Sequence, residues 1–226
     1  IDDFEANPHA AGGITFMLLI DNSGSMYDTI EGEETEEISQ QRITAAREAI
    51  TDFLDSIDNP LDQVGLASFN TYYQRLLEPT SSTEEVEAAL SDIEEPSQDE
   101  AFTELYRAIA MATEDLASVP GRKVLVVLSD GENYPFATYR EAPHPTYEED
   151  IVESGAALAA LQREGIGAFA INFATTGDPE LVDIVNESGG LLYDAESGRE
   201  LAGVYEEIRR RVLDEYRITY RPSLAP

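Results

Sequence analysis

The chain has 226 residues, of which 46 are acidic and 14 are basic, so its formal charge is −32. This charge repels nucleic-acid phosphates and anionic membrane surfaces, and neither is expected as a partner. Cysteine is absent, which excludes disulfides and thiolate metal sites, and no apolar run approaches the roughly 20 residues that cross a bilayer.

The balance of charged residues also suggests a habitat. Lys123 is the single lysine, and carboxylates are in large excess. We expect a halophilic protein, because salt screens the repulsion within such a charge. The chain begins at Ile1 and carries no signal-like segment, so we interpret it as part of a larger polypeptide.

Short, nearly continuous apolar runs alternate with amphipathic stretches, which is the pattern of a parallel sheet covered by helices. Strands are expected at residues 14–20, 64–69, 72–77, 124–129, 168–174 and 191–193. Apolar residues recur at helical spacing within residues 43–57, 86–93, 105–116, 181–185 and 201–212. The sequence therefore predicts an α/β domain with a doubly wound, Rossmann-like sheet and helices on both faces.

Capping signals mark the ends of two of these helices. Ser82 and Glu85 form a capping box, and Asp178-Pro179 supplies an N-cap followed by a proline at the first helical position. Gly189-Gly190 is expected to end the helix that Asp178 begins.

Two segments that follow strands are longer than usual connections and are candidates for functional loops. Residues 27–39 carry six acidic residues and no basic one, and are interpreted as a solvated loop rather than a set of Ca²⁺ ligands. Residues 131–150 contain three prolines and four aromatic residues, which either form a rim for a partner or pack onto their own domain. His9 and His144 are expected at the surface.

Hydroxyls and carboxylates gather where two strands end. Asp21, Ser23 and Ser25 follow the first strand of the sheet, and Asp130 follows the strand that begins at Val124. Ligands of doubly wound sheets bind beyond the carboxyl ends of strands, so the two carboxylates converge if these strands are neighbours. Hard oxygen ligands suit Mg²⁺, whereas the absence of imidazole and thiolate from the loop disfavours Zn²⁺.

The run Asp21-Asn22-Ser23-Gly24-Ser25, then Thr103 in Phe102-Thr103-Glu104-Leu105-Tyr106, then Asp130 in Ser129-Asp130-Gly131, resembles the metal-ion-dependent adhesion site of von Willebrand factor A-type domains of bacterial or archaeal type. Integrins share such domains as inserted domains. The resemblance covers about residues 14–220, and the tail 214–222 is similar to the closing strand of bacterial members. One departure is Ala101-Phe102, where many members carry glycine before the threonine.

The resemblance implies a Rossmann-like, mostly parallel sheet with one antiparallel edge strand, spanning residues 14–221 between an extension at 1–13 and a tail at 222–226. It also implies a Mg²⁺ site, in which Mn²⁺ or Ca²⁺ can substitute. Ser23, Ser25 and, as in some members, Thr103 would contact the metal directly, and Asp21 and Asp130 would act through water.

The function implied by the resemblance is a metal-dependent adhesion or interaction module and not an enzyme. An Asp or Glu carboxylate of a protein partner would complete the Mg²⁺ shell, at an extracellular, cell-surface or periplasmic location, with the cytoplasm as the alternative. A second interpretation is an interaction subunit of an intracellular metal-insertion or ATPase-linked complex. A metal-dependent hydrolase is disfavoured, because Asp-x-Asp and Gly-x-Ser-x-Gly signatures are missing.

Overall fold

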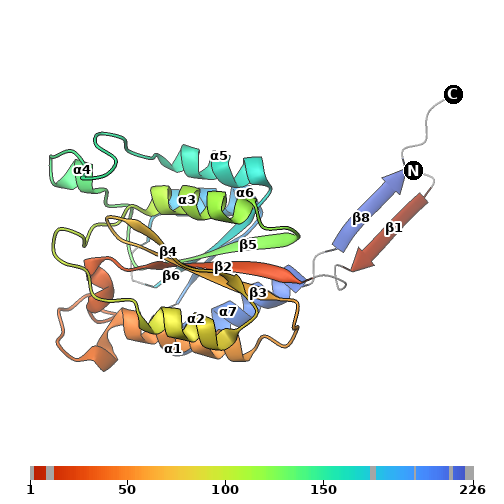
Figure 1. Cartoon of the computed structure of the whole chain (residues 1–226), viewed down its shortest axis with the longest axis horizontal. Helices are drawn as coiled ribbons and strands as arrows, with labels where there is room; N and C mark the ends of the chain where they lie inside the picture. Colours follow the sequence, from red (N-terminus) through yellow and green to blue (C-terminus); the bar gives the residue numbers. More distant parts are fainter. Residues whose placement is uncertain (1–2, 9–12, 174–176, 196, 214–215, 222–226) are drawn as a thin grey trace.

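The central sheet has six strands in the order β4-β3-β2-β5-β6-β7 in a computed structural model of the chain (Figure 1). The structure describes residues 3–8, 13–173, 177–195, 197–213 and 216–221. The strands are β2 (Ile14–Asp21), β3 (Gln63–Phe69), β4 (Tyr73–Thr80), β5 (Arg122–Ser129), β6 (Gly167–Asn172) and β7 (Leu192–Asp194). All pairs are parallel except β3 with β4, which confirms the mostly parallel sheet with one antiparallel edge strand.

Helices cover both faces of this sheet (Figure 1). One face carries α1 (Arg42–Asp55), α2 (Thr83–Ser91) and α7 (Gly198–Leu213). The other face carries α3 (Leu105–Ala117), α5 (Ser154–Glu164) and α6 (Pro179–Ser188). The doubly wound fold is thereby confirmed.

Strand β2 explains why the sequence reads as a continuous apolar run. Phe16 and Leu18 pack in the core layer beneath α1, α2 and α7, whereas Met17 and Leu19 pack in the layer beneath α3, α5 and α6. Successive side chains of a strand point to opposite faces, so a strand buried on both faces needs apolar residues at every position. The two layers together hold β2 at the centre of the domain.

Three of the expected helix ends are present, one of them in altered form. The Asp178 carboxylate accepts hydrogen bonds from the first N–H groups of α6, and Gly189 ends that helix at φ 96°. Ser82 Oγ accepts from Glu85 N–H at 3.2 Å, but the Ser82 N–H donates to Thr80 Oγ1, not to the Glu85 side chain. The capping box is therefore only half formed.

Several elements are not predicted by the sequence pattern. The sequence does not predict helix α5, because the buried face of this helix is made largely of small residues, Ala157 and Ala160 beside Leu161. Strand β1 (Asp3–Pro8) is also not predicted, and it pairs with β8 (Tyr216–Arg221) in a separate two-stranded antiparallel sheet (Figure 1). Strand β8 itself lies in the tail 214–222, where the family resemblance implied a closing strand. The remaining short helices are η1 (Gly24–Tyr27), η2 (Ile38–Gln40) and α4 (Phe136–Tyr139). No helix within the described ranges is both long enough and apolar enough to cross a membrane.

The fold creates a switch point at the carboxyl end of β2. Ile20 lies opposite Leu128, so β2 and β5 end at the same edge of the sheet. The connection after β2 passes through α1 on one face, and the connection after β5 passes through α5 on the other. Chains leaving adjacent strands toward opposite faces leave a crevice between them, which is where ligands of this fold class bind.

Candidate metal centre

Asp21 is the last residue of β2, and its carboxylate is fully buried. Asp21 Oδ1 accepts a hydrogen bond from the Ser23 N–H at 2.8 Å, and Oδ2 accepts from the Ser129 hydroxyl at 2.7 Å. Ser129 ends β5, so these bonds join the two strands at the switch point. The Asp21 side chain is thereby fixed in one orientation.

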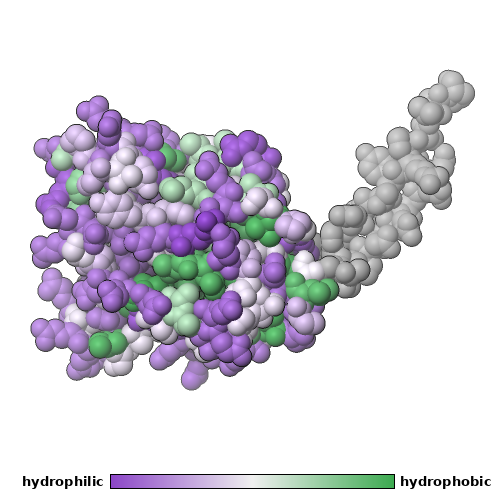
Figure 2. Space-filling model, in the orientation of Figure 1, coloured by the Kyte–Doolittle hydropathy of each residue, from purple (hydrophilic) through white to green (hydrophobic). Residues whose placement is uncertain are grey.

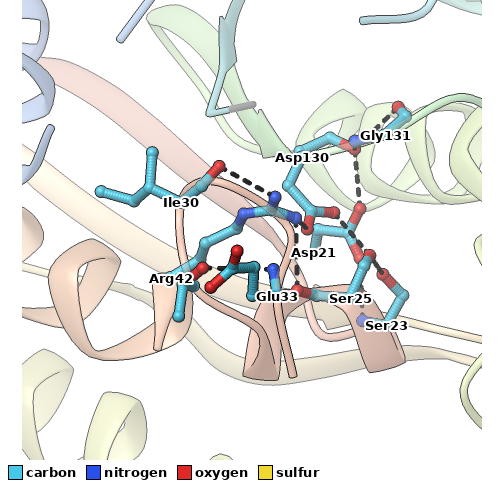
Figure 3. Close-up of polar contacts among 10 residues, drawn as sticks. Asp21, Ser23, Ser25, Ile30, Glu33, Arg42, Asp130 and Gly131 are labelled. Atoms are coloured by element: carbon cyan, nitrogen blue, oxygen red, sulfur yellow. Dashed lines mark hydrogen bonds and ion pairs between the residues drawn. The ribbon is translucent and has the colours of Figure 1, made fainter. Parts of the chain in front are cut away.

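The two serines of the motif face each other and Asp130 (Figure 3). Ser23 Oγ lies 3.3 Å from Ser25 Oγ, and the Ser25 hydroxyl donates to Asp130 Oδ1 at 2.9 Å. Ser25 is exposed, while the Asp130 carboxylate is buried. The structure therefore brings together four of the five predicted site residues, and their role as metal ligands stays a prediction.

Thr103, the fifth, lies in a segment that runs beside this loop. Its backbone pairs with Tyr134 in both directions, at 3.0 and 2.8 Å. The Gly24 N–H donates to the Ala101 carbonyl at 3.1 Å, and a Cβ on Gly24 would come within 3.2 Å of the Ala101 side chain. Glycine at this position permits the close approach. The hydrogen bonds described for Thr103 involve its backbone, and none joins its hydroxyl to the other four residues.

Arg42, the first residue of α1, enters the site without having been predicted from sequence (Figure 3). Its Nη1 lies 2.5 Å from Asp130 Oδ2 and also donates to the Ser25 carbonyl at 3.3 Å. Its Nη2 donates to the Ile30 carbonyl at 3.1 Å. An arginine at the start of an amphipathic helix reads as a solvated charge, so only the tertiary structure shows its contact with Asp130.

The donor set fits a small hard cation. Mg²⁺ binds oxygen ligands at about 2.0–2.1 Å in octahedral geometry, which places neighbouring ligands about 2.9 Å apart. The 3.3 Å between Ser23 Oγ and Ser25 Oγ is close to that spacing. Among the described residues no group of three or more His, Cys, Asp or Glu side chains is arranged to hold a metal. Any cation here would thus depend on the serine hydroxyls.

Comparison with protein families gives a match between residues 16–132 and the von Willebrand factor type A domain. This match covers half of the chain and includes the whole serine loop and Asp130. The chain belongs to this family, abbreviated VWA. No curated protein sequence matches the chain.

Solved structures show the same fold for this VWA domain at low sequence identity. The PilB minor pilin from Streptococcus sanguinis is 15% identical with a TM-score of 0.65, over 91% of this chain and 62% of the pilin. An aerotolerance-related membrane protein from Bacteroides fragilis is 17% identical with a TM-score of 0.66, over 88% of this chain and 98% of that one. The pilus adhesin SpaC from Lactobacillus rhamnosus GG is 17% identical with a TM-score of 0.63, over 91% of this chain and 31% of the adhesin. The VWA domain thus spans less than two thirds of the pilin.

The two carboxylates of the VWA domain differ in their electrostatic surroundings. Burial raises the pKa of Asp21 from 3.8 to about 7, and the nearby charge of Asp130 adds to the rise. Burial also raises the pKa of Asp130, but the Arg42 guanidinium opposes that change. The metal-free site therefore takes up a proton on Asp21 as the pH falls through about 7.

The long loop 131–150 is anchored through His144, which is buried and not at the surface as expected. Its Nδ1 accepts from the N–H groups of Thr146 and Tyr147, and Nε2 lies 2.8 Å from the Thr71 carbonyl. Because Nδ1 accepts, Nε2 carries the proton and donates. His144 thus holds the 131–150 loop against the segment that contains Thr71. His9 lies outside the described residues.

The aromatic residues of this loop differ in their exposure, and a role in partner binding stays a prediction. Phe136 packs edge-on against His144 and is buried. Tyr134 and Tyr139 stack on each other and are 44% and 50% exposed. Since Tyr134 pairs with Thr103, this exposed stack stands next to the candidate site.

The acidic residues of 27–39 are also mostly exposed, and hydrophilic residues cover most of the face in Figure 2.

Proposed function

We propose that this VWA domain is a Mg²⁺-dependent protein-binding module that docks on an Asp or Glu carboxylate of a partner. The observation that carries the proposal is the convergence of Ser23, Ser25 and the Asp130 carboxylate at the switch point, with Asp21 beneath them. Serine hydroxyls and the Thr103 hydroxyl would fill part of an octahedral shell, and waters held by the two carboxylates would fill another part. A carboxylate of the partner would complete the octahedral shell.

A binding role, not catalysis, agrees with the groups around the site. His144 is the histidine of the described residues, and both of its ring nitrogens have partners, Nδ1 the N–H groups of Thr146 and Tyr147 and Nε2 the Thr71 carbonyl. It is therefore unavailable as a general base. Proteins of similar fold are described as a minor pilin and a pilus adhesin, which supports a cell-surface or extracellular setting and a protein partner.

The test is calorimetric titration of Mg²⁺ into EDTA-treated protein in high KCl, where the charge of −32 is screened. Wild type is expected to bind one Mg²⁺. Ser23→Ala removes a proposed direct ligand without adding bulk, so binding should weaken by about tenfold or more. Ser81→Ala, an exposed serine outside the site, is the matched control.

Acetate then serves as a surrogate for the partner carboxylate. Adding sodium acetate in place of chloride should tighten Mg²⁺ binding by wild type, because metal and carboxylate share one coordination shell. If Ser23→Ala binds Mg²⁺ as tightly as wild type, the metal-docking function is abandoned.

A further inference from the structure

Arg42 is a permanent cation built into the candidate site. Its side chain is 7% exposed, and it joins Asp130 on β5's carboxyl end to the carbonyls of Ser25 and Ile30 (Figure 3). Its own N–H donates to the Asp28 carbonyl, so the backbone at the start of α1 is fixed as well. A guanidinium is effectively always charged in proteins. Asp130 thus faces a full positive charge whether or not a metal is bound.

Arg42 raises the net charge of the site by one unit, so the binding of a divalent cation turns that charge from negative to positive. Ionised Asp21 and Asp130 with Arg42 sum to −1, and a divalent cation brings the sum to +1. Without Arg42 the same sums are −2 and 0. Repulsion between like charges in a buried site is far stronger than in water. The arginine therefore opposes entry of Mg²⁺ and favours an anion at the loaded site.

We infer that Arg42 sets the coupling between metal and partner: it weakens the binding of Mg²⁺ alone and strengthens the capture of a carboxylate by the Mg²⁺-loaded site. This inference rests on the proposed function and adds a regulatory property to it. Mg²⁺ alone binds more weakly than it would without Arg42, and a partner carboxylate strengthens its binding. The local positive charge also offsets, at short range, the repulsion of an acidic partner by a domain of charge −32.

A purely structural role for Arg42 makes a different prediction. If the guanidinium only holds Asp130 and the Ile30 loop in place, its loss disorders the site, and Mg²⁺ and acetate affinities fall together. If it sets the charge, the two change in opposite directions. A neutral side chain that retains hydrogen-bonding groups separates these cases.

The experiment titrates Mg²⁺ into EDTA-treated wild type, Arg42→Gln and Arg42→Lys, each with acetate or with chloride at equal ionic strength. Arg42→Gln is expected to bind Mg²⁺ about tenfold more tightly in chloride, and acetate should tighten its binding by a smaller factor than in wild type. Arg42→Lys keeps the charge and should stay near wild type. Arg47→Gln is the control, since Arg47 lies on the same helix and donates to the Ile93 carbonyl.

Melting temperatures provide a readout even if Arg42→Gln is less stable. The rise in melting temperature between EDTA and saturating Mg²⁺ should be larger for Arg42→Gln than for wild type and unchanged for Arg47→Gln. Arg42→Gln binding Mg²⁺ no more tightly than wild type, or an unchanged effect of acetate, overturns the inference.

If the proposed function is wrong, the Mg²⁺ titrations of wild type and variants give a different set of results. If wild type binds no Mg²⁺ but Arg42→Gln binds it through Ser23, Arg42 does oppose the metal and the native domain does not use one. If no variant binds Mg²⁺, both the inference and the proposed function are overturned.

Discussion

Asp21→Asn is expected to stabilise the metal-free domain at pH 8 and to leave its stability almost unchanged near pH 4. Burial raises the pKa of Asp21 from 3.8 to about 7, so ionisation at pH 8 occurs at a cost in the folded state that the unfolded chain does not bear. Each pKa unit corresponds to about 1.4 kcal/mol, and the cost is therefore a few kcal/mol. Asparagine removes this cost, and its Oδ1 still accepts from the Ser23 N–H.

The sign follows from proton binding in the two states. Between about pH 4 and pH 7 folded Asp21 holds its proton while unfolded Asp21 has lost it, so stability falls as pH rises through this window. Above pH 7 both states are ionised and the loss is complete. In EDTA, thermal melts of wild type should therefore decline over this window more steeply than melts of Asp21→Asn.

At pH 8 the difference in melting temperature should be about 5 °C or more, given roughly 2–4 °C per kcal/mol for a domain of this size. Asp52→Asn, an exposed aspartate on α1, controls for the general loss of one negative charge. Equal pH profiles for wild type and Asp21→Asn would show that burial does not perturb the pKa of Asp21.

Saturating Mg²⁺ should stabilise wild type more at pH 8 than at pH 5.5, because the bound metal requires Asp21 to be ionised.

Physical reasons decide which parts of this domain could be predicted from sequence. Strands β2 and β5 are buried on both faces, and their apolar runs mark them directly. Once these strands are neighbours, the convergence of Asp21 and Asp130 follows from parallel pairing. The same logic does not reach α5, whose alanines give little amphipathic contrast, or β1, which pairs with a strand about 210 residues away.

The contacts that position the site side chains and the 131–150 loop could not be predicted from the sequence, for a common reason. Arg42, Ser129 and His144 each act through a partner distant in sequence, and no local pattern encodes such a pair. Arg42 resembles any helical surface cation, and His144 stands among prolines typical of an exposed loop. Local chemistry indicated where the oxygen ligands gather, whereas the charge balance around them required tertiary structure.

Asp178 illustrates this limit, since the sequence predicts it only as a helix cap. Asp178 Oδ1 accepts from the Glu180 and Leu181 N–H groups and so caps α6, while Oδ2 accepts from the Asn133 N–H at 2.9 Å. The Tyr106 hydroxyl donates to the same carboxylate at 2.8 Å. This buried group therefore ties α3 and α6 to the segment that begins at Asp130.

Asp178→Ala is expected to lower the free energy of unfolding by roughly 3–7 kcal/mol. The change removes an N-cap worth about 1 kcal/mol and leaves the Asn133 N–H and Tyr106 hydroxyl without their acceptor, at about 1–3 kcal/mol each. Asp178→Asn should cost less, because its oxygen still caps α6 although its amide cannot accept from Asn133. Asp183→Ala, on the exposed side of the same helix, should change stability by less than about 0.5 kcal/mol.

Urea unfolding of the four proteins in EDTA measures these differences, and a Mg²⁺ titration of the folded variants gives the functional consequence. Because Asn133 follows Asp130 by three residues, loss of its anchor should also weaken Mg²⁺ binding in Asp178→Asn, where α6 keeps its cap. An Asp178→Asn protein with reduced stability but unchanged Mg²⁺ affinity would show that the Arg42 and Ser25 contacts alone position Asp130. Weakened binding would instead show that the site depends on a carboxylate from the opposite layer of the fold.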